Sequence, residues 1–278
     1  MLGFGKKKKK NANELLGNYD IPIFPTTVLS ILSKLRDPDV SINELAASLE
    51  VDPGLHVRVL KTVNSVAFGL SHKVNNIGHA VNLLGRGRLE SLVLSVAVKD
   101  GVTKNNQAQW LDMTNFWATA ARRATIARGL ANILHPKVQS DVFTIGLLQD
   151  MAVPVMASTN GDRYRDIYQI WLADIDGNLT EQEQAQLSTN HAKLGAQMAE
   201  YWEFPQPLVD AIAAHHSPTA DTPLSIKIAA LIKGCPESDN GAAIVERAQQ
   251  IFGIDTTITA ETVDEILAES GALTNALS

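Results

Sequence analysis

The chain has 278 residues, of which 45% are hydrophobic and 5% aromatic, with 24 basic and 30 acidic side chains. A chain of this length can bury a large core, as one domain or as two lobes. Five basic residues form the run Lys6–Lys10, so the rest of the chain has 24 − 5 = 19 basic against 30 acidic residues, a charge of −11. Because such an acidic body repels a phosphate backbone, we expect no nucleic-acid binding by the main fold.

The N-terminal residues do not have the pattern of a secretory signal. Polar residues (11–14) follow the lysine run, where a signal requires an apolar stretch of at least ~7 residues. No later stretch approaches the ~18 apolar residues of a membrane span. The lysines could make a weak contact with an anionic surface, at roughly 1 kcal/mol each, or form a solvated tail. Cys235 is the only cysteine, which excludes an internal disulfide and favours a cytoplasmic setting.

Helical periodicity recurs along most of the chain, and alternating strand patterns are scarce, which predicts an all-α protein. The first apolar helix face consists of Val28, Ile31, Leu32 and Leu35. Ser41 with Glu44 predicts a capping box at the start of a second helix, and Asp52-Pro53 predicts the start of a third. Two further apolar sets flank Gly85, a glycine that we expect at a position of positive φ; they are Ile77, Ala80, Val81, Leu84 and Leu89, Leu92, Val93, Val96.

The later part of the chain predicts a second helical lobe. Residues 99–109 are polar and are interpreted as a linker, followed by a long helix from about Leu111 to Leu134 and another from about Ser140 through Leu148. Gly161-Asp162 predicts another helix start, and Thr180 with Glu183 a second capping box. The remaining helices are expected near 190–202, 207–216, 222–234, 242–252 and 260–269. The predicted division is a disordered basic tail at 1–17, an N-terminal lobe at 18–98, the linker, a second lobe at 110–234 and a helical extension at 235–278.

Short motifs in a fixed order give the chain a resemblance to a known family. In the first lobe they are Ile21-Pro22-Ile23-Phe24-Pro25, Asp52-Pro53, Val63-Asn64-Ser65, Phe68-Gly69 and Leu84-Gly85. In the second they are Phe116-Trp117, Gly146-Leu147-Leu148, Gly195-Ala196, Trp202, Pro205 and His215-His216. The order and spacing resemble the HDOD domains, bacterial signalling modules related to the HD-type metal-dependent phosphohydrolases. The resemblance covers residues 20 to 216 and implies an HD-domain-like helical bundle with an N-terminal helical lobe.

The resemblance also implies where a metal site would lie. In HD phosphohydrolases, histidines and aspartates hold divalent metals, which lower the pKa of a bound water and neutralise phosphoryl charge. Here Ala118 and Thr119 stand where the first histidine is expected, and the His-Asp pair is Gln149-Asp150. His191 and the pair His215-His216 match later family histidines. Because neighbouring helical residues point about 100° apart, we expect one site to use only one histidine of the pair.

The sequence therefore predicts a reduced ligand set and a non-catalytic function. The metal candidates are Asp150, His191 and His215, as a site that is vestigial or that holds iron, manganese or nickel. We expect no cofactor, and a signalling role through a protein partner or a ligand. Further candidates for ligand or partner binding are Arg86, Arg88, Gln149 and His216.

Two other functions stay open. One is an active metal-dependent phosphohydrolase that uses Asp150, His191 and His215. The other is a DNA-binding regulator, because residues 41–64 resemble a helix-turn-helix whose second helix would present His56, Arg58 and Lys61.

Overall fold

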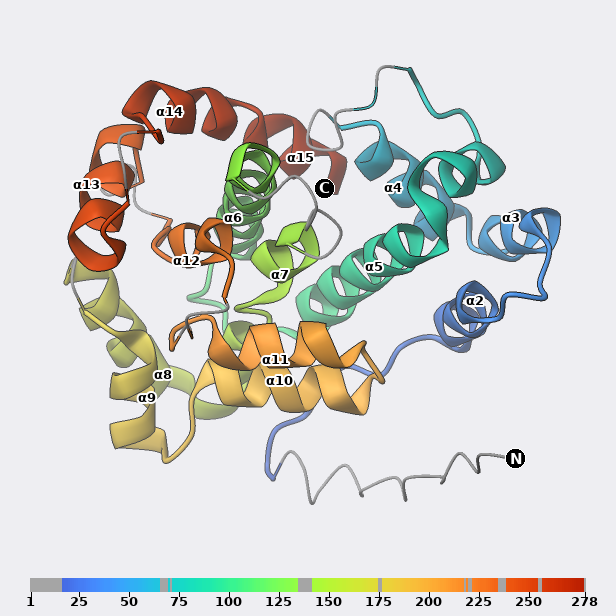
Figure 1. Ribbon diagram of the computed structural model, residues 1–278. Helices are drawn as coiled ribbons and strands as arrows, with labels where there is room; N and C mark the ends of the chain where they lie inside the picture. Colours follow the sequence, from blue (N-terminus) through green and yellow to red (C-terminus); the bar gives the residue numbers. More distant parts are fainter. Residues whose placement is uncertain are drawn as a thin grey trace, which may run out of the picture.

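The computed structural model describes residues 17–65, 70, 72–134, 142–174, 177–217, 219, 222–234, 239–254 and 257–277. Every regular element in these residues is a helix, so the predicted all-α class is confirmed (Figure 1). The predictions that concern Lys6–Lys10, Phe68-Gly69 and Cys235 lie outside the described residues.

The first four described helices have the starts and faces that the sequence predicts. They are α2 (Thr26–Arg36), α3 (Ile42–Glu50), α4 (Pro53–Val63) and α5 (Ile77–Asn105). Ser41 and Glu44 form the capping box of α3, and the Asp52 side chain accepts from the Leu55 N–H at the start of α4. The predicted face of α2 is buried, with its four apolar residues at most 4% exposed. Local capping and apolar spacing thus account for this lobe.

The predicted linker at 99–109 is wrong over its first part, because α5 continues as a helix to Asn105. Gly85 interrupts α5 with φ 76°, as expected, but the chain resumes the helix directly afterwards. Val98 and Val102 are buried on the far end of the helix. A buried apolar stripe therefore extends into a segment whose composition is polar. The packing of this stripe, and not the polar composition, determines that the segment is helical.

The second group of helices surrounds α7. It comprises α6 (Met113–Leu134), α7 (Val142–Leu148), α8 (Val153–Ala173), α9 (Leu179–Leu187), α10 (His191–Tyr201), α11 (Gln206–Ala214) and α12 (Leu224–Ala229). All seven residues of α7 are buried. The predicted helix start at Gly161 is confirmed as a kink within α8, because this glycine has a non-helical backbone with φ 56° and a helical segment follows it. The ends of α7, α10 and α11 meet around one point (Figure 1).

The C-terminal helices return to the body of the protein. These are α13 (Gly241–Phe252), α14 (Ala260–Ala268) and α15 (Ser270–Leu277). Helix α15 packs against both α6 and α4, and α14 packs against α6 (Figure 1). One continuous apolar core runs from Phe24 in the first lobe to Leu273 in α15. The extension is therefore part of the same folded unit, and the division into lobes stays a prediction.

The segment before α2 packs against the end of α10. The Phe24 ring stacks on Trp202 with a centroid distance of 4.7 Å. The Trp202 indole N–H donates to the Pro22 carbonyl at 3.1 Å. Arg36 pairs with Glu90 on α5 at 2.7 Å and donates to the Glu203 carbonyl at 2.9 Å. The motif Ile21–Pro25 and Trp202, which are far apart in the sequence, are therefore in direct contact in the fold.

Within the described residues, one stretch, Val142–Ala173, is long and apolar enough to cross a membrane by length and composition alone. In the fold, 89% of its most apolar 18-residue window is buried. This is the environment of a core helix in a globular protein, which passes the same test.

Gly146 provides a test of the α6–α7 contact. A Cβ at Gly146 would lie 2.8 Å from the Arg123 carbonyl oxygen and 2.9 Å from the Ala124 Cα. Gly146→Ala is therefore expected to lower the free energy of unfolding by about 1–3 kcal/mol, measured by urea denaturation. The matched control is Gly87→Ala in α5, where a Cβ meets nothing within 4 Å. Because alanine has the higher helix propensity, this substitution should raise the free energy of unfolding by about 0.5–1 kcal/mol. Equal effects at the two sites would contradict the close packing.

Candidate metal centre

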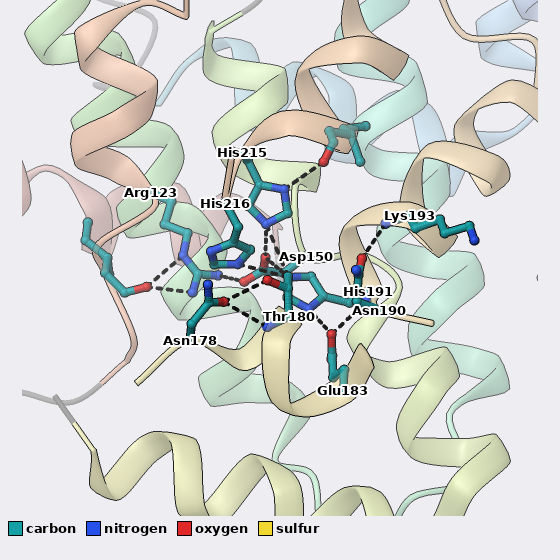
Figure 2. A network of polar contacts seen from close by, with 12 residues as sticks. Arg123, Asp150, Asn178, Thr180, Glu183, Asn190, His191, Lys193, His215 and His216 are labelled. Atoms are coloured by element: carbon teal, nitrogen blue, oxygen red, sulfur yellow. Dashed lines mark hydrogen bonds and ion pairs between the residues drawn. The ribbon is translucent and has the colours of Figure 1, made fainter. Parts of the chain in front are cut away.

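Four side chains converge where α7, α10 and α11 meet. Asp150, His191, His215 and His216 each offer one ligand atom, and these atoms lie within 4.8 Å of one another. Figure 2 shows the three imidazoles around the Asp150 carboxylate. His191 and His215 are at most 2% exposed and Asp150 is 7% exposed, whereas His216 is partly exposed, so three of the four side chains are closed to solvent.

Local backbone structure places each of these residues. Asp150 lies in the turn between α7 and α8, where its carbonyl accepts from the Val153 N–H. His191 is the first residue of α10, a helix capped by the Asn190 side chain. His215 is the C-cap residue of α11. The ligands therefore come from helix ends, where a short backbone change sets the direction of a side chain.

The prediction that one site could use only His215 or His216 is wrong. It assumed that both residues continue a helix, but α11 ends at Ala214 and the two histidines lie in the turn that follows. Their ring centroids are 4.2 Å apart. The His216 Nε2 lies 3.0 Å from the His191 Nε2, so both histidines belong to the cluster.

Glu183 is a site residue that the sequence argument missed. It was expected to complete a capping box with Thr180, but Asn178 caps α9 and Glu183 is fully buried. One Glu183 oxygen accepts from both the backbone N–H and the Nδ1–H of His191, at 2.8 and 2.7 Å. The other accepts from the Tyr164 hydroxyl. The spacing of eight residues between Glu183 and His191 is no recognisable ligand pattern, so only the fold reveals the pair.

The hydrogen bonds fix which ring nitrogens face the centre of the cluster. The His215 Nδ1 lies 2.7 Å from the Ile212 carbonyl, which can only accept, so this nitrogen carries a proton. The His191 Nδ1 donates to Glu183 for the same reason. In neutral rings, the Nε2 atoms of both histidines then present lone pairs toward the Asp150 Oδ1, at 3.0 and 3.4 Å. A cluster of acceptors this close requires a cation between them, either a proton or a metal ion.

Arg123 supplies a positive charge on the other side of Asp150. Its guanidinium pairs with Oδ2 of Asp150, and the side chain is only 4% exposed (Figure 2). Arg123 is thus a core residue of α6, and the sequence gives no sign of this because its partner is 27 positions away.

The charges shift the pKa values of the cluster strongly. Burial disfavours the Asp150 carboxylate, but Arg123 and the two nearest histidines outweigh it and hold the pKa of Asp150 well below its usual range. Burial likewise disfavours charge on His191, but Glu183 and Asp150 raise its pKa to about 10. Burial, reinforced by the neighbouring histidines, lowers the pKa of His216 well below its usual value. At neutral pH and without a metal, His191 is therefore expected to be positively charged.

The four groups fit a single divalent cation. Ligand atoms around one metal with bonds of about 2.0–2.2 Å lie roughly 3–3.5 Å apart. The observed separations are 3.0 Å from His215 to Asp150, 3.0 Å from His191 to His216 and 3.2 Å from His191 to His215. A carboxylate behind the metal-binding histidine is a common outer partner of metal sites, and Glu183 has this place behind His191. Three imidazoles and a carboxylate suit zinc, iron, manganese and nickel alike.

The positions that differ from the HD pattern contribute no ligand. The Thr119 hydroxyl donates to the Asn115 carbonyl within α6. Gln149 is 1% exposed, and within the described part of the chain its side-chain amide has no hydrogen-bond partner. Its predicted role in ligand binding therefore stays a prediction.

The remaining candidates have structural partners. Arg86 donates to the carbonyls of Lys34, Asp37 and Val40 and so stabilises the end of α2. Arg88 is half-buried beside Arg128, and a ligand role for Arg86 or Arg88 stays a prediction.

The proposed DNA-reading helix α4 offers less charge than its sequence suggests. Arg58 pairs with Asp100 on α5 at 2.6 Å, and His56 is half-buried. Lys61 is the one candidate on this helix that is exposed. The DNA-binding alternative therefore loses most of its support.

Comparisons with known proteins agree with this fold. The sequence model of the HDOD domain matches residues 21–218. An "Uncharacterized protein" of Treponema pallidum (strain Nichols) is 27% identical over 201 residues, which are 71% of this chain and 38% of that protein. The chain thus spans well under half the length of this relative.

Three solved structures share the architecture. A protein of Shewanella amazonensis SB2B, whose name proposes a metal-dependent phosphohydrolase, has a TM-score of 0.70 at 18% identity and covers 94% of this chain and 93% of its own. An HDOD domain protein of unknown function from Geobacter sulfurreducens has a TM-score of 0.66 at 22% identity, and the match covers 96% of this chain and 95% of that protein. A protein of Marinobacter aquaeolei VT8, whose name proposes signal transduction, has a TM-score of 0.65 at 19% identity. The match covers 98% of this chain and 62% of that protein. At these identities the likeness shows the fold alone, and it confirms the predicted HD-like bundle.

Glu183→Gln tests the carboxylate behind His191. The neutral amide weakens the orientation and basicity of the imidazole, so we expect zinc affinity to fall roughly 10–100-fold, measured by competition with a chelator. Glu181→Gln makes the same chemical change at an exposed position of α9 and should leave the affinity unchanged. An equal loss in both variants would contradict the assigned role.

The metal-free protein should lose stability in alkaline solution. The pKa of His191 is about 10 in the folded protein and about 6.5 when unfolded, so its contribution is complete below pH 6.5 and is lost as the pH rises toward 10. Urea denaturation from pH 7 to pH 10 in the presence of a chelator measures this decline. A His191→Gln variant should decline less over the same window. Parallel curves would contradict the raised pKa.

Proposed function

The chain belongs to the HDOD family, and from this premise we propose that it is a non-catalytic signal-transduction module that acts by binding a protein partner. In this proposal the cluster of Asp150, His191, His215 and His216 binds one divalent cation that stabilises or regulates the module. The protein works in the cytoplasm, in keeping with its single cysteine.

The observation that carries the proposal is that both carboxylates of the centre have both oxygens engaged. Asp150 uses Oδ1 toward the histidines and Oδ2 toward Arg123. Glu183 uses one oxygen for Tyr164 and the other for His191. A general base must offer a free acceptor within hydrogen-bond reach of the water that it activates. Neither carboxylate does so in this arrangement.

The number of protein ligands supports the same conclusion. Structural metal sites use four protein ligands, whereas catalytic zinc sites use three and keep one position open for water. A bound divalent ion supplies Lewis acidity and lowers the pKa of a coordinated water. The residues of this centre would instead hold the ion with three imidazoles and one carboxylate oxygen, and three of these four side chains are buried.

Signalling is supported by the family and by one structural relative. The Marinobacter aquaeolei protein shares the fold at a TM-score of 0.65, and its name proposes signal transduction. A protein partner is the expected target, because Arg58 is paired and the body of the chain is acidic, which disfavours nucleic acid. Lys6–Lys10 would add a weak contact with an anionic surface.

A metal-dependent phosphohydrolase is the competing function. Three imidazoles and an aspartate within 4.8 Å are ligands of the kind that hydrolytic metal centres use, and the name of one structural relative proposes that activity. For this function, Asp150 or His216 would have to leave its present contacts to open a coordination position.

Phosphodiester turnover separates the two functions. The chain is loaded in turn with zinc, manganese, iron and nickel, its metal content is verified, and bis(4-nitrophenyl) phosphate is supplied. We expect a rate no higher than that of an Asp150→Asn variant, because no free base and no open position face the substrate. Metal-dependent turnover that disappears in Asp150→Asn would overturn the non-catalytic function.

A further inference from the structure

Arg123 connects the metal centre with the chain segment that leads into the C-terminal helices. Its Nη1 pairs with Asp150, while its Nε and Nη2 donate to the Ile232 carbonyl at 2.8 and 2.6 Å. Asp150 and Ile232 are both buried, so these contacts have no competition from water. One planar guanidinium thus holds a metal ligand on one edge and a backbone carbonyl on another.

Arg123 holds one end of a small hydrogen-bonded group that is called the clasp below and consists of Ile232, Lys233, Gly234 and Asp239. The Asp239 carboxylate accepts from the backbone N–H groups of Lys233 and Gly234, at 3.0 and 2.6 Å. Its carbonyl accepts from Arg122 on α6 at 2.6 Å. The clasp leads directly into α13, whose N-cap is the next residue, so its position fixes where the C-terminal helices begin.

The clasp also lies against other parts of the centre. Gly234 has φ 91°, and a Cβ there would meet the Thr119 hydroxyl of α6 at 2.5 Å. The Lys233 ammonium donates to the carbonyls of Asp174 and Gly177, at 2.6 and 3.2 Å, in the loop that precedes the helix of Glu183. A displacement of Arg123 would therefore be transmitted to the start of α13 and to this loop.

We infer that cation binding at the histidine cluster loosens the clasp through Arg123 and thereby regulates the C-terminal helices. The inference rests on the ion site of the proposed function. An ion at Oδ1 of Asp150 places two positive charges across the same carboxylate that Arg123 neutralises at Oδ2. Both cations compete for one negative charge in a buried site, where charge interactions are strong. The hold of Arg123 on Asp150 and Ile232 weakens as a result.

Thermodynamic linkage makes the coupling reciprocal. If the ion weakens the hold of Arg123, then removal of Arg123 must strengthen ion binding by the same factor. If Arg123 only positioned Asp150, its removal would change the ion affinity in the opposite direction, because a misplaced Asp150 would bind the ion more weakly. The sign of the change in affinity therefore distinguishes a coupling residue from a structural one.

The first measurement is hydrogen–deuterium exchange of the full chain with and without one equivalent of zinc. Amides in residues 231–234 and 239–254 are expected to exchange at least about fivefold faster with zinc bound. A His191→Ala variant, which loses a ligand, should show no change. Full zinc occupancy with unchanged or slower exchange in these residues would overturn the coupling.

The second measurement is the zinc affinity of Arg123→Met, which keeps the apolar stem and removes the charge. It should bind zinc about tenfold tighter than the unmodified chain, and Arg122→Met, which contacts the clasp but not Asp150, should change far less. Unchanged or weaker binding in Arg123→Met would overturn the inference, and if that variant does not fold, the exchange measurement decides. Absence of zinc binding overturns the ion site and the coupling together. Phosphodiester turnover would overturn only the non-catalytic function.

Discussion

The buried Asp150 carboxylate is the point on which the second half of the structure depends. Its two oxygens face opposite ways, one toward three imidazoles and one toward the guanidinium of Arg123. A buried carboxylate without partners costs several kcal/mol, so the helices that supply the partners must meet at this place. Helices α6, α7, α10 and α11 all do so, and the tight approach at Gly146 lets α6 and α7 come close enough.

In the proposed function, the same charge arrangement favours binding over hydrolysis. A hydrolytic centre must keep a coordination position and a base available for water. Here the two carboxylates of the centre are used to neutralise Arg123, to orient His191 and to accept from Tyr164.

Much of the fold could be predicted from the sequence, because the first lobe is governed by local rules. The capping box of Ser41, the start at Asp52-Pro53 and the face of α2 all follow from spacing and side-chain chemistry. The linker prediction failed where burial of Val102 overrode a polar composition. Tertiary packing is not encoded in a local window, whereas the kink of α8 at Gly161 follows from a local signal.

The site was predicted in part. Asp150, His191 and His215 were identified from family motifs, and the structure brings them together. His216 was predicted as a ligand- or partner-binding residue and not beside His215 in one site, because a continuous helix was assumed, whereas the chain leaves the helix at Ala214. Glu183 and Arg123 could not be predicted as site residues. The partner of Arg123 is distant in sequence, and the spacing between Glu183 and His191 is not a recognised ligand pattern. Charged groups that support a site leave little trace in the sequence unless their burial is known.

X-ray absorption spectroscopy of the chain loaded with one equivalent of zinc reports the number and kind of ligands around the ion. We expect a single bound ion with three imidazole nitrogens and one carboxylate oxygen, and with no coordinated water. A first shell with two or fewer imidazoles and with coordinated water would contradict the closed four-ligand centre and would support an open, hydrolytic one.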